Sequence, residues 1–168
     1  WLRAFFDAVD RASSTARFEL ISRDPSDAIL ASLNPHVRWR KRLSIKSADP
    51  ADMPAILQTH TASVMFYAGG SISELGRSPT RMAEVLGCGL PVVANPGVGD
   101  VEHVIRQHRI GVLAQGPGPC DMDACVAELL DLLNDSQLAS RCRCVAEEQF
   151  SLEAGTAAYR KLYSHILH

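Results

Sequence analysis

The feature that most constrains the fold is a sustained alternation of apolar, strand-like runs with helix-like segments. The clearest run is 62–67 (ASVMFY), which is apolar throughout, as a strand buried on both faces of a sheet requires. Strands separated by helices of roughly ten residues predict a parallel sheet with helices on both faces and right-handed crossovers. The fold class is therefore α/β, in one domain over 1–168.

Apolar spacing and turn residues predict the individual elements. Helices are expected over 2–9, 24–33, 53–60, 80–88 and 100–108, and strands over 17–21, within 36–45, and over 62–67, 91–94 and 110–114. A loop at 115–119 precedes three closing helices whose apolar residues recur at helical spacing. Asp121, Asp135 and Ser151 are the N-caps expected for these three helices.

Composition excludes several classes of protein. Lys and Arg number 17 against 19 Asp and Glu, and a net charge of -2 argues against a nucleic-acid binder, which needs a basic surface. The five cysteines are odd in number and lack C-x-x-C spacing, so neither a disulfide framework nor a zinc site is indicated, and a reducing cytoplasm is expected. There is no apolar run of membrane-spanning length and no signal peptide. Because the chain opens at Trp1, directly on an amphipathic helix, we interpret it as a fragment of a longer protein.

Ligands of parallel α/β proteins bind beyond the carboxyl ends of the strands, which directs attention to the loops after Ile21, Tyr67 and Ala94. In 71–94 (SISELGRSPTRMAEVLGCGLPVVA) a loop with glycine and serine enters a short helix that ends at a glycine and leads into a strand. Pro79 favours an extended Ser78, so that free N–H groups near Thr80 face the loop. Such a helix start attracts phosphate.

Arg81 and Glu84 lie three residues apart and therefore share one edge of the predicted helix. Arg81 and the N–H groups suit a diphosphate, whereas the carboxylate of Glu84 suits the two vicinal hydroxyls of a ribose. The alternative is a surface ion pair between the two side chains, which contributes roughly 0.2 to 0.5 kcal/mol.

Two further places lie at the predicted ligand edge. The loop 95–100 (NPGVGD) contains Gly99, which would let the backbone approach a ligand; the alternative is a tight turn followed by a helix capped by Asp100. Arg23 follows the strand that ends at Ile21, and the alternative for it is also a turn. The six histidines are scattered and none is assigned to catalysis, and the hydrolase, P-loop and dinucleotide-binding motifs are absent.

The segment 78–100 (SPTRMAEVLGCGLPVVANPGVGD) resembles the donor-domain signature of the retaining GT-B glycosyltransferases of family 4. That signature has a Glu on a short helix, then small residues and a Pro-Val-Val strand, which here are Glu84, Gly87, Gly89 and 91–94. The likeness extends more loosely over the whole chain.

The resemblance implies a Rossmann-like domain, the C-terminal half of a GT-B fold, that holds a nucleotide diphosphate-sugar donor. Glu84 would hold the ribose; Ser78, Thr80 and Arg81 would approach the diphosphate; and the loops after Ile21 and at 44–47 would approach the nucleobase. A missing N-terminal domain would bind the acceptor and supply any contact with the inner face of the membrane. No cofactor and no metal is expected, because N–H groups and basic side chains neutralise the phosphates.

The sequence departs from the family pattern in two respects. The first Glu of the family signature is replaced by Gly76, with Glu74 two residues away. The family's first strand, which is central to its sheet, would precede Trp1, so the chain is expected to lack it. Two other readings stay open: a non-catalytic nucleotide-sugar-binding or interaction domain of the same fold, and a nucleotide-sugar epimerase.

Overall fold

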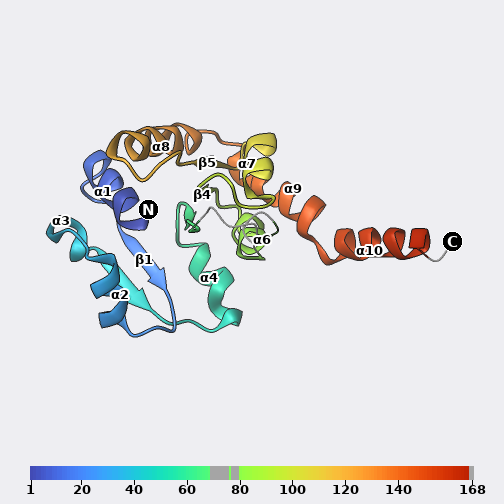
Figure 1. Cartoon of the computed structure of the whole chain (residues 1–168), viewed down its shortest axis with the longest axis horizontal. Coiled ribbons are helices and arrows are strands. Elements are labelled where there is room, and N and C mark those ends of the chain that lie inside the picture. The colour runs from blue at the N-terminus through green and yellow to red at the C-terminus, as the bar shows by residue number, and fades with distance from the viewer. Residues whose placement is uncertain (69–75, 77–79, 167–168) are drawn as a thin grey trace.

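The computed structural model describes residues 1–68, 76 and 80–166. Its five strands are β1 (Phe18–Ile21), β2 (Leu43–Lys46), β3 (Ser63–Met65), β4 (Val92–Ala94) and β5 (Gly111–Leu113). The helices up to the second strand are α1 (Leu2–Ala12), α2 (Ser26–Leu33) and α3 (Val37–Arg40), followed by a 3-10 turn η1 (Pro50–Asp52) and α4 (Met53–Leu57). The remaining helices are α6 (Thr80–Gly87), α7 (Val101–His108), α8 (Pro119–Leu132), α9 (Leu138–Phe150) and α10 (Leu152–Ile166) (Figure 1). The predicted α/β fold with parallel strands is confirmed.

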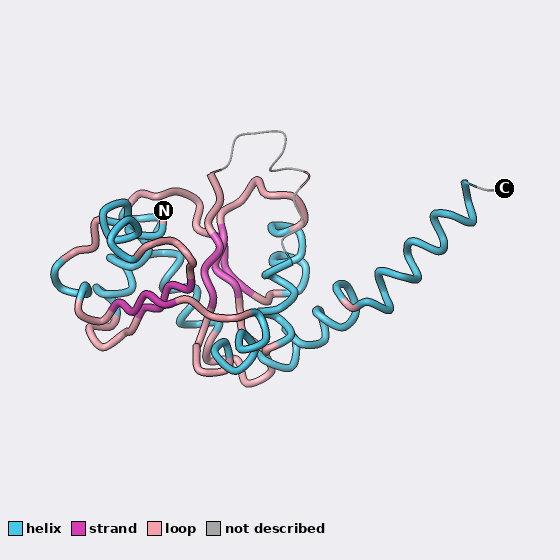
Figure 2. Tube along the Cα trace, turned by 90° about the horizontal axis from the view of Figure 1, so that it is seen from below, coloured by secondary structure: helices cyan, strands magenta, loops and turns pink. Residues whose placement is uncertain are grey.

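The strands form two separate parallel sheets. β1 pairs with β2, and β3, β4 and β5 follow one another in a second sheet, so the pairing is interrupted between β1 and β3. Figure 2 shows the two groups of strands running in visibly different directions. Within the described residues, no ladder joins the two sheets.

Helix α1 spans the interruption between the sheets through its aromatic side chains. Phe6 stacks on Phe18 of β1 with ring centroids 4.2 Å apart, and Phe5 meets Phe66, just beyond β3, edge to face at 5.8 Å. Aromatic pairs of this kind contribute about 0.5 to 1.5 kcal/mol beyond the area that they bury. One helix therefore holds both sheets in place.

A contact between the side chains of His60 and Glu19 also joins the two halves. His60, which precedes β3, places its Nε2 3.1 Å from a carboxylate oxygen of Glu19 on β1, and Lys46 of β2 binds the other oxygen at 2.8 Å. The Glu19 side chain is only 16% exposed, so solvent screens these contacts less than it would on an open surface.

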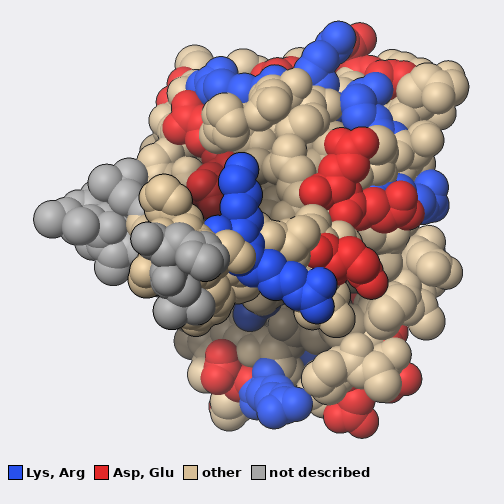
Figure 3. All heavy atoms as spheres, turned by 90° about the vertical axis from the view of Figure 1, so that its right-hand side faces the viewer, with Lys and Arg blue, Asp and Glu red and all other residues tan. Residues whose placement is uncertain are grey.

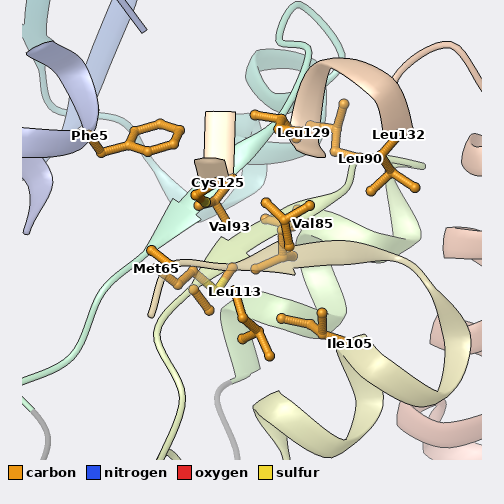
Figure 4. Packing of buried hydrophobic residues seen from close by; sticks show 14 of the residues in the cluster. Phe5, Met65, Val85, Leu90, Val93, Ile105, Leu113, Cys125, Leu129 and Leu132 are labelled. Atoms are coloured by element: carbon orange, nitrogen blue, oxygen red, sulfur yellow. The ribbon is translucent and has the colours of Figure 1, made fainter. Parts of the chain in front are cut away.

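The main core surrounds β4, whose three residues are all buried. Helix α8 packs against α1 and β5, while α6 and α7 contact β4. Figure 4 shows Cys125 of α8 and Ile105 of α7 on opposite sides of the strands that carry Val93 and Leu113. The helices thus cover both faces of the three-stranded sheet, as a continuous apolar strand requires.

Several sequence predictions need correction. The strand expected within 36–45 is present as β2, but the sequence analysis did not predict α3 before it, whose Trp39 is fully buried and donates from Nε1 to Asp7 at 2.7 Å. Asp121 lies inside the first turn of α8, whose N-cap is Gly118, and Asp135 precedes the Gln137 N-cap of α9. The third predicted cap is confirmed, since the Ser151 hydroxyl accepts the Ala154 N–H at 3.1 Å at the start of α10.

Helix α10 extends away from the body of the molecule (Figures 1 and 2), and none of its described side chains is buried. Its apolar residues are exposed, Tyr159 by 66% and Ile166 by 66%. The regular spacing therefore predicted the helix correctly, but the apolar side chains that it predicted to pack are exposed to solvent.

Candidate functional site

Helix α6 is held by its buried face. Met82, Val85 and Leu86 are at most 4% exposed and pack into the core, and the helix contacts α9 as well as β4. The helix is followed by Gly89, whose φ of +81° is a left-handed conformation that favours glycine. An added Cβ there would also lie 2.8 Å from the Arg143 guanidinium carbon of α9. The buried face fixes the helix, and the tight exit leads directly into β4.

The opposite face of α6 presents the residues predicted to bind the donor. Thr80, Arg81 and Glu84 are all exposed, and Thr80 is the first residue of the helix. Among the described residues, no ion pair or hydrogen bond joins the Arg81 and Glu84 side chains to each other or to a neighbour. The surface ion pair that the spacing left open is therefore absent, and a cation and a carboxylate stand unpaired beside one helix start.

The loop after β4 turns sharply before α7. Gly97 and Gly99 have φ values of +79° and +36°, and the Gly97 N–H donates to a Glu102 carboxylate oxygen at 3.2 Å. Asp100 stands at the N-cap position, but its side chain makes no capping hydrogen bond, so that part of the prediction is wrong. Glu102 stabilises the turn instead, and its other oxygen pairs with Arg106 at 3.0 Å.

Asn95, which the sequence reasoning passed over, is the one buried uncharged polar residue among those described, at 3% exposure. Its Oδ1 accepts the Tyr67 N–H at 2.8 Å and its Nδ2 donates to the Tyr67 carbonyl at 3.2 Å. The sequence feature that could have indicated its role is a polar residue directly after the apolar run 91–94 and before a proline.

No described hydrogen bond or ion pair joins the other predicted site residues to α6. Arg23 lies in the bend after β1, a strand of the two-stranded sheet. The Ser22 hydroxyl in this bend donates a hydrogen bond to the Asp24 carboxylate at 3.1 Å, and no described hydrogen bond or ion pair joins Arg23 to α6. The turn interpretation of Arg23 and Asp24 fits this geometry. Ser78 and Glu74 lie outside the described residues, and Gly76 is an exposed turn residue.

The described part of the chain contains a hollow that no α6 residue lines. It measures about 880 Å³ and lies between the start of α1 and α2, where Trp1, Leu20 and Asp24 contribute to its wall. Leu20 belongs to β1 and Asp24 follows that strand, so this hollow faces the carboxyl end of the smaller sheet. A second, smaller hollow of about 320 Å³ is bordered by Arg109 and Glu128.

Charged side chains and possible metal ligands are scattered over the described residues. On the face shown in Figure 3, Lys and Arg side chains lie among Asp and Glu, without a continuous basic surface. Over 1–68, 76 and 80–166, no three His, Cys, Asp or Glu residues form a cluster that could hold a metal ion. In the same part of the chain, no helix has the length and apolarity that crossing a bilayer requires.

The alternation of parallel strands and helices defines the chain as an α/β domain with the fold of one half of a GT-B glycosyltransferase. It is similar to WaaG, a glycosyltransferase involved in lipopolysaccharide biosynthesis, with a TM-score of 0.61 and 16% identity over 93% of this chain and 42% of WaaG. It is also similar to Anabaena Alr3699/HepE, solved in complex with UDP and glucose, with a TM-score of 0.63 and 16% identity over 96% of this chain and 44% of HepE.

The chain thus spans less than half the length of the solved structures that it matches. No family model and no curated protein matches its sequence. The likeness establishes the fold of one domain, as the resemblance at 78–100 predicted.

Proposed function

We propose that this chain is the donor-binding domain of a glycosyltransferase, which holds a nucleotide diphosphate-sugar while the sugar passes to an acceptor, with retention of configuration. One observation carries the proposal: Arg81 and Glu84 stand exposed and unpaired on the first turns of α6, at the carboxyl end of β3. A ligand with a diphosphate and a ribose offers each of them a partner.

The roles follow from the chemistry of each group. The N–H groups at the start of α6 have no partners within the helix and, with the helix dipole, favour an anion. Arg81 adds a permanent positive charge that pairs with phosphate oxygens through two hydrogen bonds. Glu84, one turn further along, accepts hydrogen bonds from the two ribose hydroxyls through its two oxygens. No side chain is assigned to the transfer step itself.

The proposal includes a second domain that binds the acceptor. Support comes from the coverage, since each matched glycosyltransferase is more than twice as long as the part that this chain matches. Among the described residues no ladder joins β1 and β3, which supports the central strand that the family resemblance implies outside this chain. A strand there would pair with both sheets and join them into one.

The acceptor and the location belong to the same proposal. We infer a polysaccharide or another surface glycoconjugate as acceptor, with support from the role of WaaG in lipopolysaccharide biosynthesis. The five cysteines are all free, which fits a reducing cytoplasm. Contact with the inner face of the membrane would come through the acceptor-binding domain.

A specific observation favours one competing function. Gly76 stands where the family signature has its first Glu, and it is an exposed turn residue without a side chain to contact a sugar. A domain of the same fold that binds a nucleotide-sugar without transferring it would tolerate this residue. It would still bind the nucleotide, so the two functions differ in activity and not in nucleotide affinity.

Arg81→Ala separates diphosphate binding from general misfolding. Because only the diphosphate presents charge to Arg81, the variant should bind UDP roughly ten- to a hundredfold more weakly and uridine almost as before. Isothermal titration of both ligands measures this, with Arg160→Ala on the exposed helix α10 as the matched control. Equal losses for UDP and uridine would indicate that the variant is misfolded, whereas unchanged UDP binding would contradict a contact between Arg81 and the diphosphate.

A further inference from the structure

The buried amide of Asn95 joins the ends of two strands. The described residues include two buried polar or charged side chains, Asp10 and Asn95. Asp10 is paired with Arg38 and Arg42, as a buried carboxylate requires. Asn95 instead directs its side chain to the main chain of Tyr67, 28 residues earlier.

The Asn95 side chain replaces a main-chain pairing at the end of the sheet. The last residues paired between β3 and β4 are Met65 and Ala94, so Phe66 and Asn95 come next in register. One residue further along β3, the Tyr67 N–H donates to Asn95 Oδ1 at 2.8 Å and the Tyr67 carbonyl accepts from Nδ2 at 3.2 Å. The side-chain amide thus supplies the acceptor and the donor that a continued strand would have offered through its main chain.

Because the Asn95 side chain replaces a main-chain pairing, the segments beyond β3 and β4 diverge here while they stay hydrogen-bonded to each other. Pro96 has no N–H with which to continue a ladder, and the main chain of β4 turns away through Gly97 and Gly99 toward α7. The main chain of β3 stays attached at Tyr67, one residue before the end of the described segment that leads toward α6. A single buried amide therefore sets the spacing between the two strand exits.

Both exits lead to residues of the candidate site. The chain beyond β3 arrives at Thr80, Arg81 and Glu84 on α6, and the chain beyond β4 carries Gly99. A small displacement of a positioned group reduces binding or rate well beyond its effect on stability. Resting on the proposed function, we propose that Asn95 is a positioning residue of the donor site, which fixes the main chain at Tyr67 relative to the loop 95–100 that carries Gly99.

Asn95→Asp provides the decisive test because the carboxyl group has nearly the same shape as the amide, whereas its hydrogen bonding depends on whether it is protonated. Ionised, it has only acceptors, so it loses the hydrogen bond to the Tyr67 carbonyl and faces that oxygen with negative charge. Protonated, it has one O–H donor and one carbonyl acceptor, like the amide. Burial at this position and the facing Tyr67 carbonyl oxygen disfavour the charged form, so the pKa of the introduced carboxyl should lie well above its ordinary value. Lowering the pH should therefore restore the bridge in this variant and in no variant without a polar side chain.

The first step is to find which of UDP, GDP and ADP the unaltered protein binds most tightly. The Kd of that nucleotide is then measured by calorimetry at pH 7.5 and pH 5, and each variant is compared with the unaltered protein at the same pH. Asn95→Asp should weaken binding about tenfold or more at pH 7.5 and return to within about threefold at pH 5. Asn95→Ala should be weak at both values. Val126→Ala, which removes buried volume in α8, a helix that packs against α1 and β5, should lower the melting temperature and leave Kd unchanged.

The outcomes separate the two proposals. If the unaltered protein binds none of the three nucleotides, the donor site itself is wrong and the positioning role falls with it. If the unaltered protein binds one and Asn95→Asp binds it equally well at both pH values while melting earlier, Asn95 only stabilises the fold. A loss of affinity that pH 5 does not reverse would likewise contradict the amide-like bridge.

Discussion

At the scale of single residues, the contribution of a side chain depends on the partner that the fold provides. Arg81 and Glu84 sit three residues apart, a spacing that usually gives a weak ion pair, yet the described structure leaves both unpaired. Asp10 shows the opposite case, since its burial is matched by two arginines. Spacing alone does not distinguish these outcomes, because the partners of Asp10 lie about thirty residues away in sequence.

The buried cysteines predict a loss of stability in alkali. Burial, aided by the negative charge of Glu128, raises the pKa of Cys125 from 9.0 to about 11. Burial likewise raises the pKa of Cys142 to about 11, although Arg141 and Arg143 oppose it. Because the folded-state pKa values exceed those of the unfolded chain, the stabilisation is complete below pH 9 and is lost as the pH rises through 11.

The melting temperature, followed by circular dichroism between pH 8 and 11, should therefore fall less steeply in a Cys125→Ala, Cys142→Ala double variant than in the unaltered protein. The exposed Cys120→Ala serves as control and should leave the slope as it was. Identical slopes in all three proteins would show that the two thiols titrate normally.

At the scale of elements, sequence periodicity predicts the identity of helices and strands better than their ends. The strand expected over 62–67 is paired only over Ser63–Met65, because the Asn95 side chain replaces the main-chain partner beyond that point. The helix expected over 80–88 ends at Gly87. Such ends depend on residues distant in sequence, which local patterns do not include.

Helix α10 is predicted to contribute little to the stability of the domain. None of its described side chains is buried, and Leu152 at its start is 80% exposed. Truncation after Ser151 should shift the melting temperature by less than about 3 °C, since few apolar contacts are lost. Leu138→Ala in α9, where the side chain is 5% exposed, should cost about 2 to 5 kcal/mol, which is a much larger shift. A truncated protein that melts as early as that variant would show that α10 packs on the body.

At the scale of the whole molecule, the order and type of most elements could be predicted, but their assembly could not. The alternation of strands and helices predicts a parallel α/β fold, and the resemblance at 78–100 predicts the kind of domain that the comparisons support. The division into two sheets depends on which strand edges meet, and periodicity carries no information on that. The aromatic contacts of α1 and the pair between Glu19 and His60 hold the halves together across that division.

The candidate site was predictable only where its residues lie close together in sequence. Thr80, Arg81 and Glu84 share one helix, so their grouping follows from helical geometry alone. Arg23 was included because a single parallel sheet was expected, with all its strands ending at one edge, whereas the structure places Arg23 beyond a strand of the separate two-stranded sheet. Asn95 was missed because its partner, Tyr67, lies 28 residues away and the contact uses main-chain atoms.

The most direct test of the central claim is calorimetric titration of the full-length protein and its Glu84→Ala variant with UDP, GDP and ADP. We expect one of the three nucleotides to bind, and its binding to weaken in the variant by roughly 1.5 to 3 kcal/mol, the usual effect of removing hydrogen bonds to a charged group. Glu153→Ala, which removes an exposed carboxylate from α10, should bind as the unaltered protein does. Binding that Glu84→Ala leaves unchanged, or no binding of any of the three, would contradict a donor site at α6.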